Sequence, residues 1–205
     1  MPKRPAADRG DRHPGTVRRR AQPAWTALVG AGLGVVTGRR RRRLSDIGFW
    51  ARETGRVQRR QLRWLLRTAQ RTEYGRAHDF ARLARLPDDE LVDAYRRAVP
   101  ARDWYAFADD LGRMRNEGTP DVLWPGVVRD FCQTSGTTAG DKYIPVSEAM
   151  KRSNYRAAMD IFAHLARFGV PLSRLTRGKC LFLGGSTDVE VNEAGVRTAD
   201  LSGIA

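Results

Sequence analysis

The stretch Thr134–Lys142 reads TSGTTAGDK, and it combines glycines, hydroxyl side chains and a lysine directly after an apolar, strand-like segment. Glycines let the backbone turn so that successive N–H groups converge on an anion. Lys142 supplies a point charge for a polyphosphate. The side chains that can add hydrogen bonds to phosphate oxygens are Thr134, Ser135, Thr137 and Thr138. The sequence therefore predicts a phosphate-binding loop directly after a buried-type strand.

The spacing of this loop distinguishes it from a better-known phosphate loop. The loop of P-loop NTPases has four residues between its glycines and a Ser or Thr after the lysine. Here three residues separate Gly136 from Gly140, and Tyr143 follows Lys142. A loop of the NTPase kind is therefore excluded, and a glycine-rich surface turn stays open as the alternative. Lysine is rare in this chain, which favours the phosphate-binding interpretation.

The charge of the chain is distributed unevenly. The formal net charge is +14, but residues 1–71 hold 19 Lys and Arg against 4 Asp and Glu, and the rest of the chain holds 18 against 19. Because the body is close to neutral, the net charge does not by itself indicate a nucleic-acid-binding protein. A hydrophobic content of 41% is typical of a globular domain with a packed core.

Before the loop, apolar residues recur at a helical period from Ile47 onward. They predict a long helix that ends at Thr72–Gly75, with the glycine in a left-handed cap. A second helix is expected from Pro87-Asp88, and a short third one from about Asp103. The apolar stripe predicted to face the core from the first helix comprises Trp50, Val57, Leu62, Leu65, Leu66 and Ala69.

After Gly118 the chain changes to short apolar runs separated by turn residues. Ser147 is expected to cap a helix that runs to about Phe168 and ends at Gly169. The inward face predicted for that helix is Met150, Ala157, Ile161, Leu165 and Phe168. Strands are predicted at Val122–Trp124, Val127–Phe131, Tyr143–Val146 and Cys180–Leu183, with a hairpin of Val189–Val191 and Val196–Thr198 around Asn192–Gly195. Helices followed by mixed strands and helices indicate an α/β fold with an incomplete sheet.

Residues 1–48 are expected to form a basic, disordered extension, and residues 49–205 the folded part. Ala24–Thr37 is apolar but shorter than the ~20 residues that span a bilayer, and Arg39–Arg43 stands where a signal cleavage site would be. We therefore expect no transmembrane segment and a cytoplasmic protein, with a peripheral or signal-like role as the alternative. Arg39–Arg43 could bind nucleic acid or anionic lipid or form a solvated segment; no dedicated nucleic-acid module is indicated.

The cysteines and histidines do not form a recognisable catalytic or metal site. Cys132 and Cys180 lack metal-type spacing and are expected to be buried in strands. A nucleophilic Cys132 beside the loop is the alternative to an inert one. No Ser or Cys nucleophile is spaced to pair with His13, His78 or His164, so these are expected to be structural.

The segment TSGTTAGDKYIP closely resembles the (S/T)SGTT-x-G-x-K-x-(I/M)-P motif of the Gretchen Hagen 3 family. This is the auxin-responsive promoter family of acyl-acid amido synthetases, within the adenylate-forming superfamily. The resemblance extends over roughly Phe49 to Ala205. Its other blocks are Gln58–Leu66, Thr72–Gly75, Val99-Pro100, Trp104-Tyr105, Arg113–Gly118, Leu181–Ser186 and Asp200–Ile204.

This resemblance implies that the sheet is the first part of an adenylate-forming large domain, preceded by an N-terminal helical layer. It implies a reaction in which a small-molecule carboxylic acid attacks the α-phosphate of ATP, with Mg²⁺, to give an acyl-adenylate and pyrophosphate. An amine, commonly an amino acid, then takes the acyl group. The ATP phosphate-binding residues that the motif implies are Thr134, Ser135, Gly136, Thr137, Thr138, Gly140 and Lys142.

The family's later elements, which grip adenine, bind ribose and close over the site, have no counterpart in this sequence. We therefore expect an N-terminal portion that is catalytically silent on its own, and the resemblance assigns no catalytic residue. The rival hypothesis is an inactive, truncated remnant whose Arg-rich N-terminus binds polyanions, either nucleic acid or anionic lipid.

Overall fold

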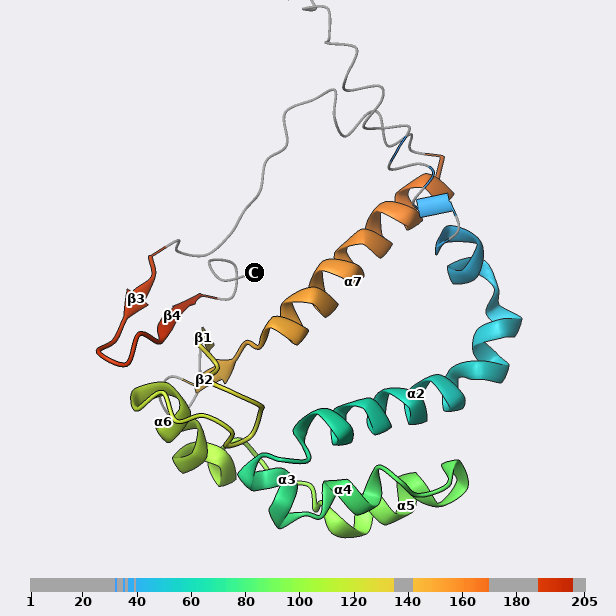
Figure 1. The fold of residues 1–205 in the computed structure, drawn as a ribbon. Coiled ribbons are helices and arrows are strands. Elements are labelled where there is room, and N and C mark those ends of the chain that lie inside the picture. Colours follow the sequence, from blue (N-terminus) through green and yellow to red (C-terminus); the bar gives the residue numbers. More distant parts are fainter. Residues whose placement is uncertain are drawn as a thin grey trace, which may run out of the picture.

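The computed structural model describes residues 40–134, 142–169 and 188–200, together with Gly32, Val35, Thr37 and Gly38. A layer of helices comes first and a small sheet follows, which confirms the predicted α/β class (Figure 1). The helices are α2 (Ile47–Ala69), α3 (Glu73–Ala77), α4 (Phe80–Leu83), α5 (Asp88–Ala98), the 3-10 helix η1 (Tyr105–Phe107), α6 (Ala108–Asn116) and α7 (Glu148–Arg167). The strands are β1 (Asp130–Thr134), β2 (Lys142–Pro145), β3 (Glu190–Val191) and β4 (Arg197–Asp200).

The carboxyl-terminal half of α2 packs on α4 and α5, as its apolar stripe predicts. Leu66 and Ala69 are buried there, and they form one core with residues of the two short helices: Phe80, Leu83, Ala84 and Leu91. Leu65, which the stripe also placed in the core, is 39% exposed. The sequence predicted α2 and α5 but missed the single turn α4, because four residues are too few to show a helical period.

Gly75 does not form the predicted left-handed cap. Helix α2 ends at Ala69, and Thr72 instead caps α3 by accepting a hydrogen bond from the Gly75 N–H at 2.9 Å. Gly75 lies inside α3, where an added Cβ would stand 2.0 Å from the carbonyl oxygen of Ala69. The glycine is therefore required by the close approach of two helix ends and not by a positive φ.

The segment Val122–Trp124 is not a strand. The carbonyl of Val122 and that of the preceding Asp121 accept hydrogen bonds from the amino end of α3. Asp121 O accepts from Glu73 N at 2.7 Å and Val122 O from Tyr74 N at 3.1 Å. These bonds satisfy helix N–H groups that have no partner within the helix. The next strand begins at Asp130, three residues later than predicted, because Asp121 and Gly126 close a turn through the Gly126 N–H.

The sheet has the strand order β2-β1-β4-β3. Strand β1 pairs antiparallel with β2 and parallel with β4, and β3 and β4 form the predicted hairpin, with Gly195 at a φ of 70° in its turn. Leu111, Met114, Val122, Val128, Phe131 and Val196 form a second core, which joins α6 to this sheet. Cys180–Leu183, predicted as a further strand, lies outside the described residues.

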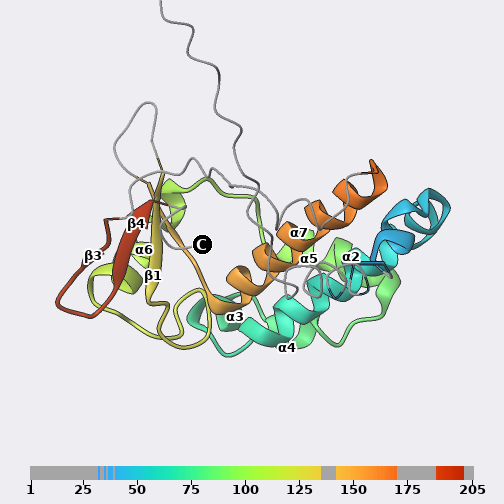
Figure 2. The ribbon, with the colours of Figure 1, turned by 90° about the horizontal axis from the view of Figure 1, so that it is seen from above.

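Helix α7 has the predicted ends but not the predicted buried face. Ser147 Oγ accepts from Met150 N at 3.2 Å, and Gly169 ends the helix with a φ of 74°. Ile161 and Phe168, however, are 63% and 78% exposed, and Ala157 is also exposed. Figures 1 and 2 show α7 leaving the sheet as a long arm, and no described element covers those side chains. Within the described ranges, no helix is both long and apolar enough to cross a membrane.

Candidate functional site

The predicted phosphate-binding loop connects the antiparallel strands β1 and β2. Thr134 and Lys142 form the last residue pair of that ladder, and Thr134 Oγ1 donates to the Lys142 carbonyl at 3.4 Å. The structure thus brings the two ends of the loop together. Ser135, Gly136, Thr137, Thr138 and Gly140 lie outside the described residues, so their part in phosphate binding stays a prediction.

The loop leaves the sheet at an edge where two parallel strands end. Strand β1 runs parallel to β4, with Gln133 beside Asp200 as the last pair, so both strands point their carboxyl ends to this edge. In open α/β sheets, ligands bind in the crevice outside the carboxyl ends of the strands. The parallel pairing joins residues about 67 positions apart in sequence.

Lys142 is half-buried at the mouth of the loop, where aromatic residues before α6 line it. Its ammonium lies 5.1 Å from the centroid of the Tyr105 ring, within the range of a cation–π contact. Trp104 Nε1 donates to the Tyr143 carbonyl at 3.3 Å and ties this segment to β2. The loop motif gives no sign of Tyr105, because only tertiary packing brings it to Lys142.

Arg115 connects α6 to strand β2 and to the β3–β4 hairpin beside the loop. Its guanidinium lies 3.6 Å from the centroid of the Tyr143 ring, its Nε donates to Thr198 Oγ1 at 3.3 Å, and its carbonyl accepts from Asn192 Nδ2 at 2.7 Å. Arg115 therefore fixes β2 and the β3–β4 hairpin against one helix. Sequence reasoning missed this role as well, since one arginine among many shows no pattern.

A buried carboxylate braces the opposite end of β1. Asp130 Oδ1 accepts from Arg197 Nε at 2.6 Å, and its other oxygen accepts from Lys151 Nζ. Burial by itself would raise the pKa of Asp130, but hydrogen bonds from Arg197 and Lys151 outweigh it and hold that pKa below its usual value. The charge is paired on both sides, so Asp130 links β1, β4 and α7 as a structural group.

Cys132 has the character of a core residue. Its side chain is 1% exposed, and burial, with the charge of Asp130, raises the pKa of its thiol. A raised pKa keeps the thiol protonated and unreactive. This agrees with the hypothesis of an inert Cys132 and opposes that of a nucleophilic Cys132. The second cysteine, Cys180, lies outside the described residues.

The histidines that the structure describes carry no catalytic geometry. His78 Nδ1 lies 2.7 Å from the Ala98 carbonyl, and its ring packs at a tilt of 54° against Tyr74, with 4.4 Å between centroids. His164 is half-buried on α7. Across residues 40–134, 142–169 and 188–200, no three His, Cys, Asp or Glu side chains gather as metal ligands.

Taken together, the described ends of the loop supply an ammonium and a hydroxyl at the carboxyl edge of two parallel strands. The ammonium fits a phosphate-bearing ligand, because a lysine acts as a point charge toward phosphate. The Thr134 hydroxyl can donate to a phosphate oxygen once it leaves the Lys142 carbonyl. Mg²⁺ in nucleotide sites is held largely through substrate phosphates, with only one or two carboxylates. The donor set is therefore compatible with a metal–nucleotide complex.

Comparison with known proteins gives a family match over most of the chain. The family model described as "GH3 family N-terminal domain" matches residues 43–204. The chain is similar to the probable indole-3-acetic acid-amido synthetase GH3.1 of Oryza sativa subsp. japonica, with 28% identity over 164 residues. The alignment covers 78% of this chain and 25% of that relative, so the chain spans about a quarter of the relative's length. No solved structure matches the chain.

Proposed function

The chain belongs to the GH3 family, and from that premise we propose that it forms the ATP phosphate-binding part of an acyl-acid amido synthetase. The relative of Oryza sativa is named for amide formation on indole-3-acetic acid. For the present chain we propose the broader activity only: ATP-dependent adenylation of a small carboxylic acid, followed by transfer of its acyl group to an amine or amino acid.

The position of Lys142 carries this proposal. Lys142 begins β2 at the end of a Gly and Thr loop and pairs with Thr134, the last residue of β1. At this edge of the sheet the parallel strands β1 and β4 have their carboxyl ends. The contact with Tyr105 holds the Lys142 ammonium near the end of the loop. No carboxylate among the described residues forms an ion pair with Lys142. A half-buried lysine that forms no ion pair within the described part of the chain has a charge available for an anionic ligand.

ATP would supply the phosphoryl centre, and Mg²⁺ would bind through its phosphates. The chain's own part is electrostatic and geometric. Lys142 neutralises charge on the phosphates, and the hydroxyls of Ser135, Thr137 and Thr138 donate to their oxygens. The Thr134 hydroxyl joins them by giving up its bond to the Lys142 carbonyl, and the amides of Gly136 and Gly140 complete the loop. Such fixed donors stabilise charge as it develops in a reaction and orient the reacting phosphate.

The first test is ATP binding to the 205-residue chain by isothermal titration calorimetry. Lys142→Ala removes one charge-assisted contact, so we expect affinity for Mg-ATP to fall roughly ten-fold or more. Arg85→Ala, which removes an exposed positive charge on the surface far from the loop in sequence, is the matched control and should change affinity less than about two-fold. Equal Mg-ATP affinities for the wild type and Lys142→Ala would contradict the proposal that the loop binds the phosphates.

A further inference from the structure

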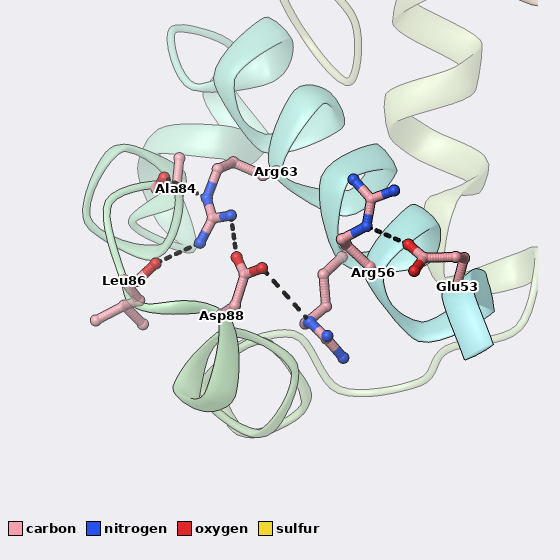
Figure 3. Close-up of polar contacts among 7 residues, drawn as sticks. Glu53, Arg56, Arg63, Ala84, Leu86 and Asp88 are labelled. Atoms are coloured by element: carbon pink, nitrogen blue, oxygen red, sulfur yellow. Dashed lines mark hydrogen bonds and ion pairs between the residues drawn. The ribbon is translucent and has the colours of Figure 1, made fainter.

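The arginines of α2 differ in how their charge is neutralised. On the side that faces α5, Arg63 donates to Asp88 and to the carbonyls of Ala84 and Leu86, as Figure 3 shows. Arg59 lies 3.7 Å from the same carboxylate, and Arg56 pairs with Glu53. Each of these guanidinium groups therefore has a carboxylate within reach.

The side of α2 that faces α7 is different. Arg60 projects there, and Arg152 and Arg156 face it from α7 at positions one helical turn apart. No carboxylate in the described ranges forms an ion pair with any of the three. Asp160 of α7 shares a neighbouring hollow with Arg60, but it pairs with Arg40 instead. Together with Gln61, Trp64, Ala149 and Ser153, the three arginines line a hollow of about 430 Å³, which we call the arginine hollow. Its lining contains no Asp or Glu.

Three like charges around one cavity repel each other. Like-charged residues at positions i and i+4 of a helix destabilise it, and Arg60 adds a third charge from the opposite helix. An anion in the hollow would relieve this repulsion. The guanidinium fork matches the geometry of phosphate oxygens, and Gln61 and Ser153 provide further hydrogen-bond donors.

The arginine hollow is separate from the phosphate-binding loop. Strand β2 begins at Lys142 beside the loop, and α7 begins beyond its other end, at Glu148. The hollow is lined by Ala149, Arg152, Ser153 and Arg156 of that helix, and it shares no residue with the loop. Its volume lies within the range of small-molecule sites in proteins.

We propose that the arginine hollow binds a linear chain of two or more phosphate groups, held by Arg60, Arg152 and Arg156. A single phosphate can satisfy one or two guanidinium groups, whereas three groups on two facing helices match a longer anion. Trp64 is 44% exposed at its rim and offers a flat apolar surface beside the charges. Successive phosphate groups are supplied by a free polyphosphate, in which anhydride bonds join them, or by a nucleic-acid backbone, in which sugars separate them.

The experiment measures tripolyphosphate binding to the full chain carrying Lys142→Ala, so that the loop does not contribute. We expect the triple variant Arg60→Gln/Arg152→Gln/Arg156→Gln in that background to bind roughly ten-fold more weakly. The indole N–H of Trp64 should shift on binding in a ¹⁵N spectrum, and the triple variant should lose that shift. All three side chains are exposed, so their replacement leaves the core intact.

A second triple variant, Arg71→Gln/Arg85→Gln/Arg97→Gln, is the matched control, because it removes three exposed positive charges elsewhere. It should retain affinity within about two-fold. An equal loss in both triple variants would overturn the proposal, and so would inorganic phosphate binding as tightly as tripolyphosphate. A short oligothymidylate forms the second arm: preference for it identifies a nucleic-acid backbone as the source, and preference for tripolyphosphate a free polyphosphate.

Discussion

At the scale of single residues, the contact between Lys142 and Tyr105 is the most informative one. The ammonium lies over the face of a ring that is itself half exposed. A cation–π contact of this kind contributes about 0.5–1 kcal/mol. Tyr105 therefore acts as a positioning residue for the lysine that the loop motif singles out.

Replacing Tyr105 tests that role. Tyr105→Leu removes the ring face, and we expect Mg-ATP affinity to fall about two- to five-fold. Tyr105→Phe keeps the face and should bind like the wild type. In the Lys142→Ala background the Tyr105→Leu change should have no further effect. Calorimetry on the wild type, the two single variants Tyr105→Leu and Lys142→Ala, and their double variant measures this coupling. An undiminished effect without Lys142 would show that Tyr105 acts independently of it.

Asp130 provides a prediction on pH. Its pKa in the folded chain lies below the unfolded value of about 3.9. Its contribution to the free energy of unfolding is therefore complete above pH ~4 and is lost as the pH falls through the folded-state pKa. Urea unfolding between about pH 6 and pH 3 should show this loss in the wild type.

The variant Asp130→Asn isolates that contribution. It should lower the free energy of unfolding at neutral pH by roughly 2 kcal/mol, because Lys151 and Arg197 lose the carboxylate that they share. The loss stays moderate because both cationic side chains are partly exposed and can bind water instead. Its acid-induced loss of stability should be smaller than that of the wild type. Asp109→Asn, at an exposed position of α6, is the control and should stay within about 0.5 kcal/mol. Identical acid sensitivity in Asp130→Asn and the wild type would contradict the assignment.

At the scale of elements, the junction between α2 and α3 depends on one glycine. Gly75→Ala would place a methyl group 2.0 Å from the Ala69 carbonyl oxygen, so the two helix ends would have to separate. We expect a loss of about 2 kcal/mol or more in the free energy of unfolding, measured by urea denaturation. Gly112→Ala in α6 is the control: its nearest neighbour atom is 4.0 Å away, and it should be neutral or stabilising by up to about 1 kcal/mol.

Local sequence signals predicted those elements whose cause is local. Ser147 and Gly169 mark the ends of α7 because capping and a positive φ each involve a few neighbouring residues. Predictions failed where distant residues decide the outcome. Val122–Trp124 does not form a strand, and the Val122 carbonyl instead accepts a hydrogen bond from the amino end of α3. The apolar face of α7 at Ile161 and Phe168 is exposed. Periodicity gives the orientation of an apolar face but not what covers it.

At the scale of the whole molecule, the same limit applies to the candidate site. The loop Thr134–Lys142 is recognisable because its residues are contiguous. The pairing of β1 with β4, and the approach of Tyr105 and Arg115, depend on long-range packing that no contiguous motif records. The chain therefore presents two anion-binding candidates of different origin: a motif-defined loop at one edge of the sheet and the arginine hollow between α2 and α7.

The central claim is that the loop binds the phosphates of ATP, and a ¹⁵N spectrum of the labelled 205-residue chain tests it most directly. Titration with Mg-ATP should shift the amides of Thr134–Lys142 most strongly, and Lys142→Ala should reduce those shifts at equal ligand concentration. If the amide signals of the loop do not shift and only those around Arg60, Arg152 and Arg156 do, the claim that the loop binds the phosphates is contradicted.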